Sequence, residues 1–155
     1  NHGRLCSAMG DEAHREEGIS LLKEAVALSE ELAGEDGAQY SGQILTSCSM
    51  LLGDLLKAQD ADSEDALAYY RKGLAWGSRF AASHSTVANI DNYIVALYRV
   101  IAHRATPVEE KRELAEQMCA VSGQLYERTG NPRHKNFVEM SEQLLEIVKG
   151  EIPVI

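Results

Sequence analysis

Apolar residues recur at every third or fourth position along most of this chain, and this spacing predicts amphipathic α-helices. In the first helical stretch, Ile19, Leu22 and Val26 share one side, while Glu16 and Glu24 lie mainly on the other. No segment shows the alternation of apolar and polar residues that marks a half-buried strand. We therefore expect an all-α protein with six main helices, over residues 11–33, 38–59, 64–82, a fourth stretch that Ser83 or Ser85 caps and that ends near 104, 107–128 and 132–149.

Turn and capping residues mark the last two helices. We expect Thr106 to cap the fifth helix, with Pro107 at its first position. Gly130 should end that helix, and Asn131 should cap the sixth helix just before Pro132. The predicted helices are separated by only a few residues, and loops of that length can only join helices that pack as antiparallel neighbours.

A group of residues with helical spacing recurs three times along the chain. In each group a small residue is followed four positions later by a larger one, and three positions beyond that by another small one. The groups start 48 and 49 residues apart, a period typical of stacked helical hairpins. The small residues should let two helices approach closely, with the larger one filling the space between them. The three groups are Gly18/Leu22/Ala25, Ala66/Tyr70/Gly73 and Ala115/Cys119/Ser122.

The second and third predicted helices resemble a tetratricopeptide repeat. Leu52 and Gly53 stand where that family has Leu-Gly in its first helix, and Ala66, Tyr70 and Gly73 match its small–aromatic–small pattern in the second. The resemblance covers residues 12–82 best. At 155 residues the chain is expected to form a single domain over 1–155, and the resemblance implies a right-handed superhelix of hairpins. In this family the first helices line a concave groove that takes a peptide or a partner helix.

The fourth predicted helix is apolar around nearly its whole circumference, so it should lie in the middle of the stack. One stripe interrupts this pattern, formed by Asn89, Asn92, Ala96, Arg99 and His103. Polar residues confined to one stripe of a buried helix face either a groove or a partner. The alternative is an ordinary solvated stripe, as many surface helices have.

The resemblance extends the stripe to other helices. Residues 42 positions earlier should face the same groove, and the last helix would prolong it. Asparagine amides can both donate to and accept from a peptide backbone, and Arg99 could hold a carboxylate with two hydrogen bonds. The complete predicted groove consists of Ser47, Met50, Asp54, Lys57, Asn89, Asn92, Arg99, His103, Arg133, Asn136 and Gln143.

The net charge of −9 is concentrated in the first half of the chain. Residues 1–70 contain 4 basic and 14 acidic residues, whereas residues 71–155 contain 11 basic and 10 acidic ones. A basic surface for nucleic acid or an anionic membrane is therefore not expected. No apolar run approaches the roughly 20 residues of a membrane-spanning helix.

No motif for catalysis, metal binding or a cofactor stands out. The five histidines lack the short helical spacings of metal ligands, and no Gly-x-Ser-x-Gly or Cys/His pair suggests a nucleophile. Cys48 and Cys119 fall on apolar helix faces, where reduced cysteine behaves as a small hydrophobe. Together with the distant Cys6, they favour a reducing, cytoplasmic setting.

We therefore expect a non-catalytic protein-interaction module that binds a peptide or partner helix, without cofactor or metal. One alternative is a regulatory or sensor domain of a larger protein, since residues 5–9 resemble the end of a helix that begins earlier. A small all-helical enzyme is the third alternative. The apolar segment 152–155 should either fold back on the last helix or mark a cut in a longer chain. The sequence does not indicate an oligomeric state.

Overall fold

Six α-helices and no strand make up the part of the chain that this computed structural model describes, residues 12–36 and 39–151. The predicted all-α class and the six main helices are therefore confirmed for these residues. The predictions for residues 5–9, Cys6 and segment 152–155 lie outside them. The helices are α2 (Glu12–Asp36), α3 (Gln39–Gln59), α4 (Glu64–Ser83), α5 (Val87–Ala102), α6 (Val108–Thr129) and α7 (Pro132–Glu151).

The turn between α6 and α7 has the predicted capping chemistry. Gly130 ends α6 with a left-handed φ of 64°, a conformation that glycine adopts without steric cost. The Asn131 side chain accepts a hydrogen bond from the backbone nitrogen of Arg133 at 2.9 Å, and Pro132 is the first residue of α7. Local sequence alone is sufficient to define this boundary.

Two other predicted caps are wrong. The N-cap of α5 is Thr86, whose hydroxyl accepts from the backbone nitrogen of Asn89, whereas the Ser83 and Ser85 hydroxyls donate back to carbonyls of α4. Thr106 does not cap α6, because its hydroxyl donates to the carbonyl of Val100 at 2.7 Å. Each of these three hydroxyls instead bonds back to a carbonyl four or six positions earlier, in the last turns of α4 or α5.

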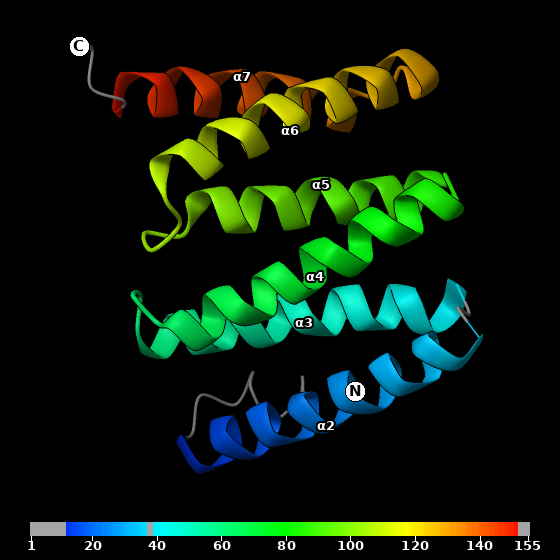
Figure 1. The fold of residues 1–155 in the computed structure, drawn as a ribbon, viewed down its shortest axis with the longest axis vertical. Coiled ribbons are helices and arrows are strands. Elements are labelled where there is room, and N and C mark those ends of the chain that lie inside the picture. The colour runs from blue at the N-terminus through cyan, green and yellow to red at the C-terminus, as the bar shows by residue number, and fades with distance from the viewer. Residues whose placement is uncertain (1–11, 37–38, 152–155) are drawn as a thin grey trace.

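The chain runs back and forth in an open stack (Figure 1). Each helix packs on the next one along the chain, and α3 also contacts α5. The helices α2 and α7 lie at opposite ends of the stack, so the fold is not a closed bundle.

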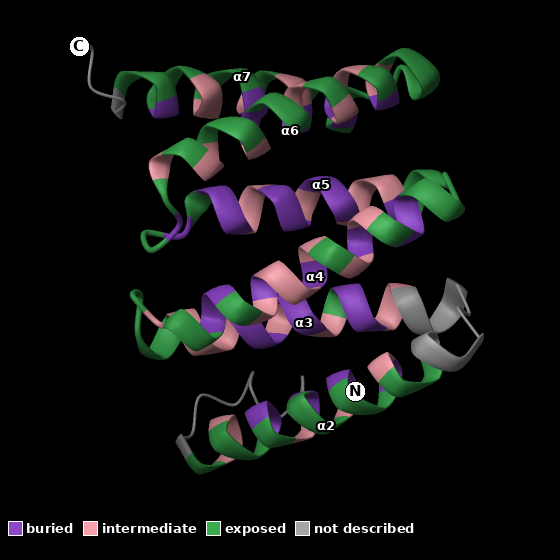
Figure 2. Ribbon diagram, in the orientation of Figure 1, coloured by how far each residue is buried: buried purple, intermediate pink, exposed green. Residues whose placement is uncertain are grey.

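The tight contact predicted between the second and third helices is confirmed. Ala66 and Tyr70 are at most 1% exposed, and Gly73 is also buried. A Cβ atom added to Gly53 of α3 would lie only 2.5 Å from the Tyr70 ring, so the ring of α4 occupies the space that the missing side chain leaves. Buried residues run along nearly the whole of α5, as its apolar sequence predicts (Figure 2).

Among the described residues, no helix is long and apolar enough to cross a membrane.

Candidate functional site

The predicted polar stripe runs along the line where α3 and α5 lie side by side. At its centre, Arg99 of α5 holds Asp54 of α3, with 3.0 Å between Nε and Oδ1 and 3.4 Å between Nη2 and Oδ2. The Tyr70 hydroxyl donates to the same carboxylate at 2.5 Å. Three helices therefore contribute one side chain each to a single polar cluster.

This cluster forms one wall of an open hollow of about 370 Å³, which we call the α3–α5 hollow. Arg99 and Asp54 remain about one-third exposed in it. The Arg99 guanidinium carbon lies 5.9 Å from the centre of the Tyr98 ring, within the range of a cation–π contact. Lys57 also lines the hollow and forms no ion pair with a described residue. With two cations and one carboxylate, the hollow is basic in a chain of net negative charge.

Tyr70 connects this hollow to the core. Its side chain is almost fully buried between α3 and α4, while its hydroxyl reaches Asp54. Burial raises the pKa of the phenol well above its ordinary value, and the hydrogen bond to Asp54 raises it further. The folded protein therefore keeps Tyr70 protonated at pH values where the unfolded chain loses that proton.

This pKa shift predicts an alkaline loss of stability. Above pH ~10 the unfolded chain binds one proton fewer at Tyr70 than the folded chain, so the free energy of unfolding should fall by up to about 1.4 kcal/mol per pH unit. Below pH 9 the group should contribute no slope. Urea unfolding of wild type and Tyr70→Phe between pH 8 and 11 would measure the difference. Parallel curves for the two proteins above pH 10 would contradict the assignment.

Asn89 does not face a groove, and its predicted exposure is wrong. It is 2% exposed, its amide nitrogen donates to the His84 carbonyl at 2.8 Å, and its Oδ1 accepts from Gln43 Nε2 at 3.0 Å. Both ends of the amide are thus used to fix the start of α5 against α3. Asn89 is therefore a buried polar residue that links helices, not a residue that faces a ligand.

His103 and Met50 are also buried, contrary to prediction. The His103 Nε2 atom lies 2.9 Å from the Ser63 carbonyl, and its Nδ1 atom accepts from the backbone nitrogen of Ala105. A carbonyl can only accept, so Nε2 carries the proton and the ring is the neutral tautomer. His103 therefore joins the α3–α4 loop to the end of α5.

The register between α3 and α5 explains these differences. The two cross-helix pairs, Gln43–Asn89 and Asp54–Arg99, join residues 46 and 45 positions apart, not 42. This shift of about one helical turn sets Asp54 opposite Arg99. Met50 and Ala96 are both buried, and Met50 lies against Gly73 of α4, whose added Cβ atom would be 3.3 Å from it. The middle of the predicted groove is therefore closed by apolar packing.

The remaining predicted residues divide between two places. Ser47 is exposed and Asn92 partly exposed, both on the helices that form the α3–α5 hollow. Arg133, Asn136 and Gln143 are exposed on α7, which α5 and α6 separate from α3 (Figure 1). The structure thus brings Asp54, Lys57 and Arg99 together, but not the α7 residues with them.

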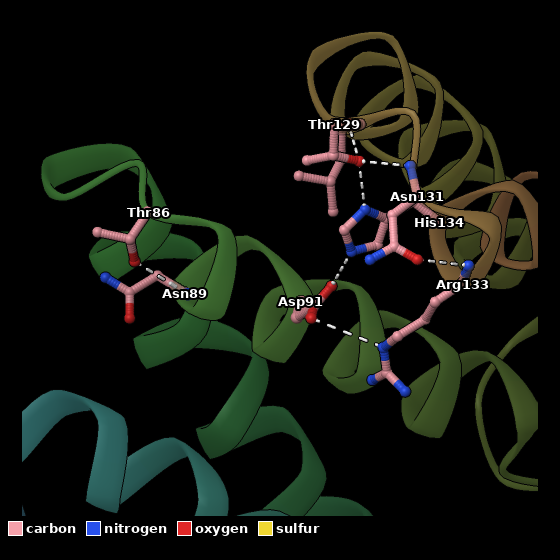
Figure 3. Close-up of polar contacts among 8 residues, drawn as sticks. Thr86, Asn89, Asp91, Thr129, Asn131, Arg133 and His134 are labelled. Atoms are coloured by element: carbon pink, nitrogen blue, oxygen red, sulfur yellow. Dashed lines mark hydrogen bonds and ion pairs between the residues drawn. The ribbon is translucent and has the colours of Figure 1, made fainter.

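A second polar cluster joins α5 to the start of α7 (Figure 3). His134 is 2% exposed, with its Nδ1 atom 2.6 Å from the Thr129 hydroxyl and its Nε2 atom 3.0 Å from Asp91 Oδ1. Arg133 approaches the other oxygen of Asp91 at 3.7 Å. The order hydroxyl, imidazole, carboxylate is that of a nucleophile with its base and orienting acid.

Burial and bonding favour a structural role for this cluster. The Thr129 oxygen also lies within hydrogen-bond distance of the Leu125 carbonyl and the Asn131 nitrogen, so it completes the α6–α7 turn. With both ring nitrogens bonded and the ring almost fully buried, His134 offers no face to a substrate. Among the described residues, no group of histidine, cysteine or acidic side chains could hold a metal ion.

Another hollow, between α4 and α6, contains none of the predicted residues. Its walls include Ser78 and Ala82, and Ala75 lines an adjoining hollow, so small residues follow one another at spacings of three and four on α4. This spacing could be read from the sequence, but it does not by itself indicate a hollow, because small residues are common in helices.

No protein-family model, curated protein or solved structure matches this chain.

Proposed function

We propose that this protein is a non-catalytic interaction module that binds an acidic peptide segment in the α3–α5 hollow. The observation that carries this proposal is the pair of cations, Lys57 and Arg99, in an open hollow on an otherwise acidic chain. Arg99 is held in place by Asp54 and lies beside the Tyr98 ring, so it loses little conformational freedom on binding.

The ion pair that Arg99 already forms with Asp54 determines how a peptide would be held. The Nε and Nη2 atoms of Arg99 face Asp54, so a peptide carboxylate would meet Nη1 and the Lys57 ammonium. The partly exposed Asn92 amide, seven positions before Arg99 on α5, could pair with the peptide backbone. Lys57 and Asn92 are therefore the residues on which recognition should depend most.

The resemblance to tetratricopeptide repeats supports the same surface. The close approach of Gly53 and Tyr70 fits the family's hairpin, with α3 as first and α4 as second helix. The contact between α3 and α5 fits neighbouring first helices, which in that family line the concave side. A right-handed superhelix with its ligand groove along α3 and α5 is the arrangement that we propose.

Selection from a displayed random-peptide library tests this proposal. Enriched peptides should carry an aspartate, a glutamate or a terminal carboxylate, and their affinity can be measured by fluorescence anisotropy. Lys57→Ala combined with Asn92→Ala should weaken binding at least tenfold, about 1.4 kcal/mol. Both side chains are partly exposed, so thermal stability should change little.

Lys23→Ala, which removes an exposed lysine from α2, is the matched control and should bind like wild type. Full affinity in the double variant would place the peptide site elsewhere on the molecule.

A further inference from the structure

A long groove lies between α4 and α6, with α5 as its floor. It consists of two hollows of about 470 and 310 Å³ that share Ser78, Tyr93 and Gln117, and we call it the α4–α6 groove. Side-chain bridges cross from α6 toward α4 at both ends of it. Arg71 pairs with Glu110 at one end, and Arg128 donates to the Ser85 carbonyl at 2.6 Å at the other. Between these bridges, where the two hollows meet, Gln117 of α6 donates to the Tyr93 hydroxyl of the floor.

Both walls of the groove have the spacing of a helix-packing seam. On α6 the lining residues include Leu114, Gln117, Val121, Gln124 and Arg128, separated by three, four, three and four positions, with Leu125 beside them. This seam is about 21 Å long at 1.5 Å per residue. On the α4 side, Ala75, Ser78, Ala82 and Ser85 repeat the same alternation. Such spacing lets side chains of a third helix interdigitate with both walls.

The groove has an apolar floor and a cationic end. Ile90, Tyr93 and Leu125 lie at its base, and no acidic residue lines either hollow. Arg128 is exposed and forms no ion pair with a described residue. Arg71, Arg99, Arg104, Arg112 and Arg133, in contrast, each have an acidic partner. An amphipathic helix with carboxylates beside its apolar seam would therefore complement this groove.

Helix α2 has these features, an apolar seam with carboxylates beside it, on a side that it exposes. Leu28 and Leu32 are 59% and 46% exposed, and with the partly exposed Leu21 and Ala25 they form a seam spaced four, three and four. This seam spans about 17 Å, within the length of the groove. Glu24 and Glu31 flank it and form no ion pair with a described residue. Leu28 and Leu32 therefore give α2 an exposed apolar strip that a partner could cover.

We propose that this chain self-associates head to tail, with α2 of one copy docked in the α4–α6 groove of the next copy. Leu28 and Leu32 would lie over the apolar floor, and a glutamate of α2 would meet Arg128. The contact joins two different surfaces, so each assembly keeps one free α2 and one free groove and can grow further. This proposal does not depend on peptide binding in the α3–α5 hollow.

Sedimentation of the full chain over micromolar to near-millimolar concentrations tests the proposal. The average mass should rise with concentration and pass that of a dimer. Leu28→Glu with Leu32→Glu should weaken association at least tenfold, and so should Arg128→Glu or Ser78→Arg in the groove. Ile147→Glu is the matched control, because Ile147 is 60% exposed on α7, and it should associate like wild type.

Mixing the two kinds of variant gives the most specific result. An α2 variant retains its groove and a groove variant retains its α2, so together they should form a one-to-one complex that does not grow. A wild-type chain that stays monomeric at every concentration would overturn the proposal. So would full association of both groove variants, or a mixture that remains monomeric while circular dichroism shows both variants folded.

Discussion

Ala66→Leu should lower the free energy of unfolding by roughly 1–3 kcal/mol, because it overpacks the contact between α3 and α4. Ala66 is fully buried, and its carbonyl lies 3.1 Å from where a Cβ atom of Gly53 would stand. The two backbones are therefore too close to admit a larger side chain. Urea unfolding monitored by circular dichroism gives the measurement.

Ala68→Leu is the control for this substitution. Ala68 is exposed on the same helix, so the same added volume should change stability by no more than about 0.5 kcal/mol. If both variants unfolded at the wild-type midpoint, Ala66 would not close an interface. The packing argument for stacked hairpins would then fail.

Gly53→Ala should destabilise the protein by about 1–2 kcal/mol, although alanine is the better helix former. Replacing a glycine inside a helix ordinarily gains about 0.5–1 kcal/mol. Here the new Cβ atom would lie 2.5 Å from the buried Tyr70 ring, and moving the ring would disturb its bond to Asp54. The overpacking cost should therefore exceed the gain in helix propensity.

Gly123→Ala provides the comparison on α6. Apart from the backbone of its own helix and its chain neighbours, no atom lies within 4 Å of its added Cβ, so this variant should become more stable by the ordinary amount. Thermal melts of the two variants should move in opposite directions. A shift of the same sign and size in both would show that Tyr70 does not depend on the space beside Gly53.

The sequence predicted the structure best where that structure depends on residues close together along the chain. The α6–α7 turn was predictable because glycine freely adopts the left-handed conformation that ends α6, and the fixed φ of proline suits the first residue of α7. The α5 cap was missed because Ser83, Ser85 and Thr86 can all bond either forward to a nitrogen or back to a carbonyl. The choice among them depends on how the loop packs.

The site was less predictable, because it depends on the register in which α3 and α5 pack against each other. The sequence placed Arg99 on the predicted surface by its helical spacing, and Asp54 and Lys57 through the repeat resemblance, and the structure brings the three together. The sequence could not give the register between α3 and α5, which Gln43–Asn89 and Asp54–Arg99 fix. Burial of a polar residue such as Asn89 is visible only once both of its partners are in place.

Nuclear magnetic resonance would test the central proposal, peptide recognition in the α3–α5 hollow, most directly. A library-selected acidic peptide, titrated into the ¹⁵N-labelled protein, should shift the backbone amide signal of Lys57, the side-chain amide of Asn92 and the Arg99 Nε–H. Signals of α7 residues such as Gln143 should stay in place. Shifts confined to α7, or to the α4–α6 groove, with Lys57, Asn92 and Arg99 unmoved, would contradict the proposal.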